Sequence, residues 1–272
     1  MKKRLLLAAL TLTAFLAALY GSRNVVVLLG LDPDQFSDLS FSLYRASSWI
    51  GVPMLVLAAW YGPRRVLREL GWQASLSTGL LMGLACTLPM LLGYAVLFPL
   101  TAMSGPALFS ALWRGAFWAG LSEETLFRGF LFGQFYRRVK LPWLGVVVVE
   151  SGIFATGHLY QSHDLLSAVS VLAVTFGGGV WFGWLYKSWQ NLWVPIFMHI
   201  CMNGWWMVFE VDNSAVGSVG ANVFRITTIG LSVVITRWHL RRQARLAEPP
   251  VGATAGELAG GMACTGRFDL PY

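Results

Sequence analysis

The chain is dominated by apolar segments of the length that a lipid bilayer requires. A transmembrane helix needs roughly 20 predominantly apolar residues. Here 56% of the 272 residues are hydrophobic and only 12% are charged, whereas a soluble domain typically carries about 25% charged residues. We therefore predict an all-α fold, a polytopic membrane helix bundle of about eight transmembrane helices. The predicted spans are 5–29, 43–60, 76–100, 107–136, 141–160, 165–186, 190–209 and 215–236.

The charges between these segments alternate in sign. Basic clusters occur before the first span, in every second connection and after the last span: Lys2, Lys3 and Arg4; Arg64, Arg65 and Arg68; Arg137, Arg138 and Lys140; Lys187; and Arg237, Arg241, Arg242 and Arg245. Because basic loops favour the cytoplasmic side, the pattern predicts an even number of spans in a cell inner membrane, with both termini cytoplasmic. The net charge of +7 thus indicates a lipid bilayer as partner and no nucleic acid.

The domain organisation that we predict is simple. Residues 1–245 form one integral membrane domain, and residues 246–272, rich in Pro, Gly and Ala, form a disordered C-terminal tail. The N-terminal 20 residues resemble a signal peptide with a basic start, but no clear cleavage site follows, so we expect them to remain as the first span. Gly177, Gly178, Gly179 and Gly183 form a small-residue face that predicts close helix packing, with a functional hinge as the alternative.

Ionisable residues inside the apolar segments are costly in a bilayer and are functional by default. Glu124 and Arg128 are four residues apart on a helix and can form an ion pair. Glu123 points about 100° away from Glu124, so its carboxylate is free to face a cavity. The alternative is an ion pair that only locks helix packing, beside an exposed glutamate.

Two later segments each carry a histidine. Phe154 and His158 share one helix face with Glu150. Alone, His158 would be read as a hydrogen-bonded packing residue. The ion-pair partner of Glu150 is left open among three arginines without an obvious mate: Arg45, Arg114 and Arg225.

His199 and Asn203 are also four residues apart and point to one side of a helix. Both can donate hydrogen bonds to a developing oxyanion, and the alternative is an interhelical polar clamp worth about 1 kcal/mol. At 1.5 Å per residue, the motif residues of the three helices lie roughly 18–27 Å from their cytoplasmic ends. Polar groups at a shared depth require water there.

This set of side chains suits hydrolysis by an activated water. A carboxylate and an imidazole can hold and deprotonate a water molecule, and a second imidazole and an amide can stabilise a tetrahedral intermediate. Glu with two His is also a zinc ligand set, although there is no His-Glu-x-x-His motif of an ordinary zinc protease. A proton- or ion-coupled carrier is a further class, which the absence of repeated halves disfavours.

The three motifs together resemble the CPBP family, which includes type II CAAX prenyl endopeptidases and bacteriocin-processing (Abi) enzymes. The family pattern Glu-Glu-x-x-x-Arg, Phe-x-x-x-His and His-x-x-x-Asn/Asp occurs in order within a motif core at about 107–205. The matching residues are Glu123, Glu124, Arg128, Phe154, His158, His199 and Asn203.

The resemblance implies an intramembrane endopeptidase that acts on a membrane-embedded or lipid-proximal protein or peptide. It implies Glu123 as general base with His158 holding the water, Glu124 and Arg128 as support, and His199 with Asn203 as the oxyanion pocket. It favours a glutamate-type enzyme without a metal cofactor, with zinc as the alternative. The alternative function is a catalytically silent membrane scaffold or bacteriocin-immunity protein.

Overall fold

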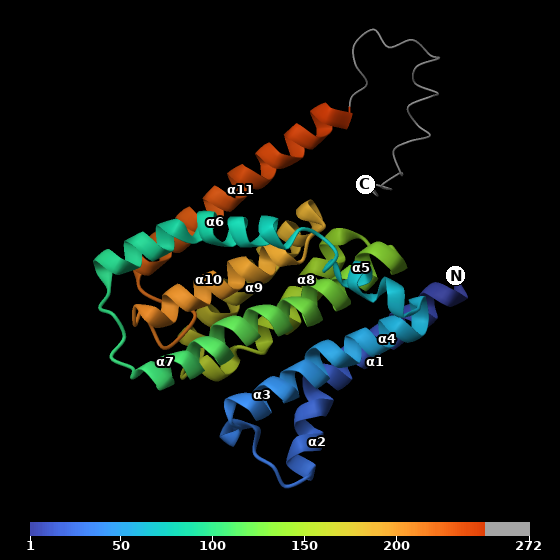
Figure 1. Cartoon of the computed structure of the whole chain (residues 1–272), viewed down its shortest axis with the longest axis horizontal. Coiled ribbons are helices and arrows are strands. Elements are labelled where there is room, and N and C mark those ends of the chain that lie inside the picture. The colour runs from blue at the N-terminus through green and yellow to red at the C-terminus, as the bar shows by residue number, and fades with distance from the viewer. Residues whose placement is uncertain (248–272) are drawn as a thin grey trace. The chain divides into compact units, whose positions relative to one another are not determined.

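The computed structural model describes residues 1–247, and every regular element in that range is a helix (Figure 1). The predicted all-α class is therefore confirmed. The chain divides into two units, Met1–Ser232 and a second unit that begins at Val233. The second unit holds the C-terminal part of the last helix, where the Arg242 guanidinium lies 5.7 Å from the Trp238 ring centre. Of the predicted tail 246–272, Leu246 and Ala247 belong to the last helix, so that boundary was wrong, and residues 248–272 lie outside the described residues.

Many of the helices follow one another without a break. The elements of the N-terminal part are α1 (Lys2–Leu16), η1 (Ala17–Gly21), α2 (Ser22–Leu28), η2 (Pro33–Gln35), α3 (Asp38–Arg45), η3 (Ala46–Gly51), α4 (Val52–Tyr61), η4 (Pro63–Arg65), α5 (Val66–Leu70) and α6 (Leu76–Leu97). Those of the rest are α7 (Gly105–Leu112), η5 (Trp113–Glu123), η6 (Thr125–Phe132), η7 (Gln134–Val139), α8 (Trp143–Thr156), η8 (Leu159–Gln161), α9 (Leu165–Trp189), α10 (Trp193–Val208) and α11 (Val219–Ala247).

The predicted spans all coincide with helical segments, but not all of them are long and apolar enough to be counted as spans. Within the described residues five helical stretches meet that standard: Lys2–Leu28, Leu76–Leu97, Trp143–Gln161, Leu165–Trp189 and Val219–Leu246. The helices over 43–60, 107–136 and 190–209 do not, and α10 has only 16 residues. The chain is thus a multi-pass membrane protein, while the number eight stays a prediction.

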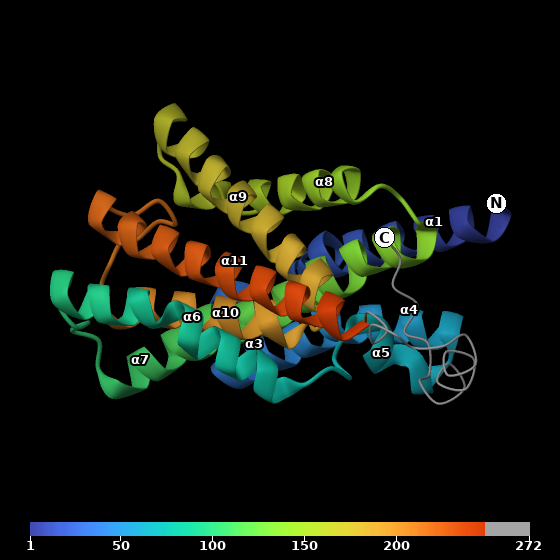
Figure 2. The same ribbon diagram turned by 90° about the horizontal axis from the view of Figure 1, so that it is seen from above.

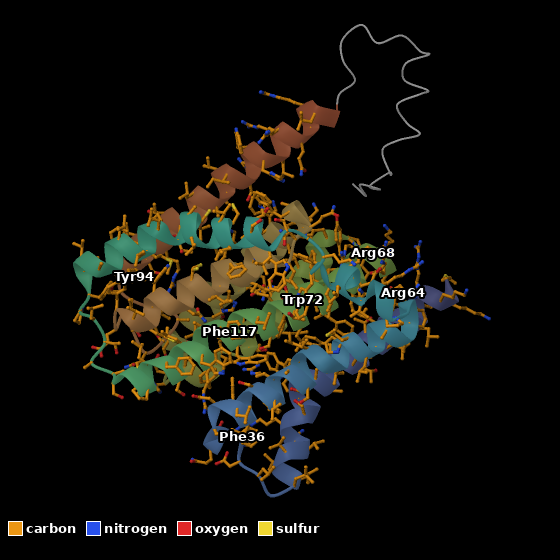
Figure 3. The ribbon with its side chains drawn as sticks, in the orientation of Figure 1. Phe36, Arg64, Arg68, Trp72, Tyr94 and Phe117 are labelled. Atoms are coloured by element: carbon orange, nitrogen blue, oxygen red, sulfur yellow. The ribbon has the colours of Figure 1, made fainter. Side chains whose placement is uncertain are left out.

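Two of the basic loops meet in the first unit. Glu69 is buried, and its carboxylate accepts hydrogen bonds from the Arg138 guanidinium, one of them 2.8 Å long. The Glu69 carbonyl accepts a further bond from Arg137. Arg64 and Arg68, from the same turn as Glu69, lie toward the end of the first unit where the chain starts (Figure 3). This contact agrees with the prediction that these two basic connections lie on one side of the membrane.

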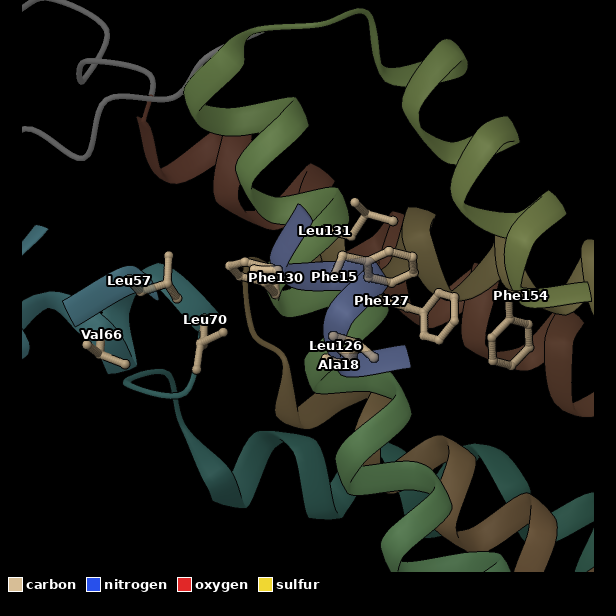
Figure 4. Close-up of a cluster of buried hydrophobic side chains, with 11 residues drawn as sticks. Phe15, Ala18, Leu57, Val66, Leu70, Leu126, Phe127, Phe130, Leu131 and Phe154 are labelled. Atoms are coloured by element: carbon tan, nitrogen blue, oxygen red, sulfur yellow. The ribbon is translucent and has the colours of Figure 1, made fainter. Parts of the chain in front are cut away.

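A cluster of buried apolar side chains surrounds the helix that carries the Glu-Glu motif (Figure 4). Phe127 of η6 lies edge-to-face against Phe15 of α1, with ring centres 5.1 Å apart, and against Phe154 of α8 at 5.2 Å. Leu57 of α4 and Leu70 of α5 belong to the same cluster. Helices that precede and follow η6 in the sequence therefore fix its position.

Glycines allow the closest approaches between helices. A Cβ atom at Gly79 or Gly83 of α6 would lie within 2.7 Å of α10 atoms, so α6 and α10 are in direct backbone contact. Gly179 and Gly183 of α9 face α8, which is joined to α9 by a short turn (Figure 2). The predicted close packing is confirmed at Gly179 and Gly183, but it is wrong for Gly177 and Gly178, where a Cβ atom would meet nothing within 4 Å.

We predict that Gly179→Ala lowers the melting temperature of the detergent-solubilised protein. The new methyl group would lie 2.8 Å from the Ser151 Cβ atom and 3.1 Å from its Cα atom, and overpacking of this kind typically costs about 1–3 kcal/mol. Gly178→Ala is the matched control, because a Cβ atom there meets nothing within 4 Å and alanine is the better helix former. Equal melting temperatures for the two variants would contradict the close contact between Gly179 of α9 and Ser151 of α8.

Candidate active site

The helix that carries Glu123 and Glu124 departs from ordinary α-helical geometry. After α7, the continuous helix consists almost entirely of π-helical stretches, η5, η6 and η7. In a π-helix the backbone bonds run from residue i to i+5, and such stretches are rare and concentrate at functional sites. Every residue of η6 is buried. The sequence predicted an unusually long helix here but gave no sign of its π-helical turns.

Arg128 lies at the centre of a fully buried ion cluster. Its Nη1 atom lies 3.1 Å from Glu124 Oε1, and its Nε atom lies 3.1 Å from Glu150 Oε1. Its Nη2 atom donates to the Gly179 carbonyl at 3.4 Å. The side chains of Glu124, Arg128 and Glu150 are all at most 1% exposed. The Arg128 guanidinium thus pairs with two carboxylates, which its planar arrangement of several N–H donors allows.

The partner of Glu150 differs from every candidate that the sequence offered. Those candidates are Arg45, Arg114 and Arg225. Instead Glu150 of α8 pairs with Arg128, which η6 presents to α8. Arg114 donates to Asp38 at 2.6 Å, and Arg225 donates to a carbonyl oxygen and to Asn222. The sequence predicts only one partner for Arg128, the carboxylate of Glu124 four residues earlier. With its charge already balanced by Glu124, Arg128 was not among the candidate partners of Glu150.

His199 joins the same cluster from α10. Its Nδ1 atom lies 2.8 Å from Glu124 Oε1, the oxygen that also faces Arg128, and its ring is stacked on Phe182 of α9 with centres 5.5 Å apart. Because a carboxylate oxygen accepts hydrogen bonds, we assign the proton to Nδ1. The Nε2 atom is then the nitrogen that remains for another partner.

His158 lies in the turn that follows α8, not within the helix as its spacing suggested. Its Nδ1 atom lies 2.8 Å from the Phe154 carbonyl oxygen. A carbonyl oxygen can only accept, so Nδ1 carries the proton, and in the neutral ring Nε2 is an acceptor. Phe154 also lies under Arg128, whose guanidinium carbon is 4.5 Å from the ring centre. Phe154 therefore connects His158 to the buried cluster by packing.

Glu123 and Asn203 are less enclosed. Both are half-buried. Asn203 uses one amide hydrogen to donate to the Gly115 carbonyl at 2.8 Å, which leaves its second amide hydrogen. Among residues 1–247, no hydrogen bond or ion pair joins Glu123, His158 and Asn203 to one another. The structure thus unites Glu124, Arg128 and His199 directly, and the catalytic roles of all six motif residues stay predictions.

The described residues offer no group of three or more His, Cys, Asp or Glu side chains arranged to hold a metal ion. The side chains closest to such an arrangement, Glu124 and Glu150, already face Arg128. A reaction without a metal cofactor stays a prediction.

Fold and site together define a multi-pass membrane protein with a buried carboxylate–arginine–histidine cluster. Comparison with known proteins shows which family and which relatives this protein is similar to. Residues 104–205 match the family model described as type II CAAX prenyl endopeptidase Rce1-like. The site-bearing region is thus similar to this family, in agreement with the resemblance that its three motifs indicated.

Two curated relatives match a similar length of chain. The "Putative membrane peptidase YdiL" of Bacillus subtilis is 30% identical over 90 residues, which cover 33% of this chain and 33% of YdiL. The "Membrane-embedded CAAX protease MroQ" of Staphylococcus aureus is 31% identical over 97 residues, 34% of this chain and 36% of MroQ. The match spans about a third of the length of each relative. No solved structure matches the chain.

We predict that Arg128→Met strongly destabilises the folded protein. The change leaves Glu124 and Glu150 facing each other without a cation, and breaking a buried pair typically costs about 3–5 kcal/mol. Thermal unfolding in detergent measures the effect. Arg23→Gln is the control, because the Arg23–Asp34 pair is exposed and such pairs contribute about 0–1 kcal/mol. Similar melting temperatures for both variants would show that the cluster does not hold the fold.

Proposed function

We propose that the protein is an intramembrane endopeptidase, a hydrolase that cuts a peptide bond in a membrane-associated protein or peptide. The observation that carries this proposal is the contrast between two adjacent carboxylates. Glu124 is fully buried and held by Arg128 and His199, whereas Glu123 is half-buried and accepts no hydrogen bond from another described residue. One carboxylate is structural, and its neighbour is available to a water molecule. The names of the two relatives support the same class of activity.

In the proposed mechanism, Glu123 accepts a proton from water while His158 Nε2 accepts the second hydrogen bond of that water. The resulting hydroxide attacks the carbonyl carbon of the scissile bond. The oxyanion receives hydrogen bonds from the second amide hydrogen of Asn203 and from His199 Nε2. Because Nδ1 faces Glu124 Oε1, donation from Nε2 requires that both ring nitrogens of His199 carry a hydrogen. Glu123 then passes its proton to the leaving amine, and the C–N bond breaks.

Water activation by Glu123 makes the enzyme of the glutamate type, and the membrane setting limits its substrates. The polar groups lie within helices surrounded by apolar side chains, so a substrate must be embedded in the bilayer or lie close to it. We further propose that the protein resides in a cell inner membrane with both termini in the cytoplasm. The contact between the basic loops around Glu69 and Arg138 supports a common side for these loops.

We predict that Glu123→Gln reduces cleavage by about 10²–10⁴-fold, the contribution typical of a general base, while the protein still inserts and folds. The measurement is mass spectrometry of new C-termini in membrane proteins exposed to wild-type or variant enzyme. Glu210→Gln is the control, because Glu210 lies in a loop and accepts hydrogen bonds from Thr101 and Ala102 that an amide oxygen can also accept. Retained turnover in Glu123→Gln would refute the role of Glu123.

The same comparison tests the alternative of a catalytically silent scaffold or immunity protein. A scaffold would keep its cellular phenotype in both Glu123→Gln and His199→Ala, and would lose it only in variants that unfold, such as Arg128→Met. An enzyme would lose the phenotype in the first two variants although both remain folded.

We predict that a zinc chelator leaves the cleavage rate of the purified enzyme unchanged, because the proposed mechanism takes its charge stabilisation from His199 and Asn203. Treatment with 1,10-phenanthroline, alongside a known zinc protease as positive control, makes the measurement. Loss of activity that returns on addition of zinc would show that the enzyme depends on a metal.

A further inference from the structure

Arg45, at the end of α3, is a cation with enclosed N–H groups that donate no hydrogen bond to another described residue. Its Nε and Nη1 atoms are enclosed, and neither has a hydrogen-bond partner among the described residues. The guanidinium lies 3.8 Å from the ring centre of Trp49 and 5.4 Å from that of Phe41. Arginine keeps its charge in proteins, and an enclosed charge is costly unless it has a counter-charge. Stacking on two aromatic rings supplies only part of that compensation.

The packing of α3 determines the direction in which Arg45 can reach. Asp38 accepts hydrogen bonds from Ser110 at 2.7 Å and from Arg114 at 2.6 Å. One turn later along α3, Ser42 accepts a bond from Trp113 at 2.8 Å. These contacts lie on one face of α3, since residues four apart share a face.

Arg45 follows Ser42 on that face. The helix of α3 and α4 and the helix that begins with α7 run in the same direction (Figure 1). Arg45 therefore extends along η5 beyond Arg114, toward the end of η5. That end is Glu123.

The Glu123 carboxylate has a favourable electrostatic effect on the Arg45 guanidinium, with smaller effects from Tyr44 and Tyr160. Among the described residues no hydrogen bond or ion pair joins Arg45 to Glu123. The other charged groups of the surrounding helices have partners: Arg114 with Asp38, and Arg128 with Glu124 and Glu150. Tyr160 also stacks on His158, with ring centres 6.4 Å apart. The proposed mechanism assigns the water to Glu123 and His158, so the electrostatic effect of Arg45 concerns one of the two groups that would hold that water.

We propose that Arg45 is a positioning residue that pairs with Glu123 and orients its carboxylate toward the attacking water. Its catalytic part rests on the proposed function. The residue comes from the N-terminal helices, outside the region 104–205 that matches the family. The cluster around Arg128 would then fix Glu124 from one side of the helix, while Arg45 fixes Glu123 from another.

The first experiment measures the pairing without any reference to catalysis. Melting temperatures of wild type, Arg45→Gln, Glu123→Gln and the double variant, all in detergent, form a double-mutant cycle. We expect Arg45→Gln to lower the melting temperature in the wild-type background and to lower it much less in the Glu123→Gln background. Equal shifts in the two backgrounds would overturn the proposal. If Arg45→Gln fails to fold, folding of the double variant supports the pairing and its failure overturns the proposal.

The second experiment measures the consequence for turnover. We expect Arg45→Gln to lower kcat by roughly 10²-fold, the cost typical of a misplaced reacting group, with KM unchanged, and Arg45→Lys to restore most of kcat because it keeps the charge. Arg23→Gln is the matched control: Arg23 lines the same cavity of about 230 Å³ as Arg45, but its partner is Asp34 at 2.9 Å. Its kcat should equal that of wild type.

The outcomes separate the two levels of inference. Coupling between Arg45 and Glu123 in a protein that shows no cleavage would refute the proposed function and leave the pairing intact. Cleavage that requires Glu123 but proceeds at the full rate in Arg45→Gln would refute the role of Arg45 and leave the proposed function intact. A fall in kcat that Arg45→Lys does not restore would assign Arg45 a packing role, contrary to the proposal.

Discussion

The buried contact of Arg128 with two carboxylates is the constraint on which the rest of the site depends. A charged group without a partner is expensive inside an apolar helix bundle, so Glu124, Arg128 and Glu150 must stay together for the bundle to form. Glu150 belongs to α8, and Arg128 also donates to the carbonyl of Gly179 in α9. His199 brings α10 to the same carboxylate oxygen. Four helical segments are therefore held at one level by a single guanidinium and its acceptors.

This arrangement explains how two neighbouring glutamates come to differ in character. Glu124 is fully buried and its Oε1 atom faces both Arg128 and His199, whereas Glu123, on the adjacent face of the helix, is half-buried. The two imidazoles are also held in fixed orientations, each through its Nδ1 atom. His199 is oriented by a carboxylate and His158 by a backbone carbonyl, and in each ring the nitrogen Nε2 is left for other chemistry. A hydrolytic site needs such groups in fixed orientations before a substrate arrives.

The sequence predicted those features that follow from helical spacing. The apolar segments predicted the helices, and the separation of four residues predicted the Glu124–Arg128 pair. The glycines at 179 and 183 predicted a close helix contact that the structure confirms. Features that depend on contacts between distant segments could not be read in this way. The candidate partners that we predicted for Glu150 were wrong, because the four-residue spacing had already paired Arg128 with Glu124. The sequence around Arg128 does not show that one guanidinium can pair with carboxylates of two helices. The position of His158 outside α8 was also missed, since an apolar run does not show where its last turn ends.

The π-helical stretches around the Glu-Glu motif limit how this motif can be moved to other proteins. A π-helix has more residues per turn than an α-helix, so consecutive side chains are separated by a smaller rotation about the axis. On an ordinary α-helical scaffold, the six residues Glu123 to Arg128 would have a larger rotation between consecutive side chains. The Glu123 carboxylate would then point further away from Glu124 and in a different direction from the one it has here. A designer who wishes to reproduce this chemistry therefore has to copy the backbone of residues 113–139 as well as the letters of the motif.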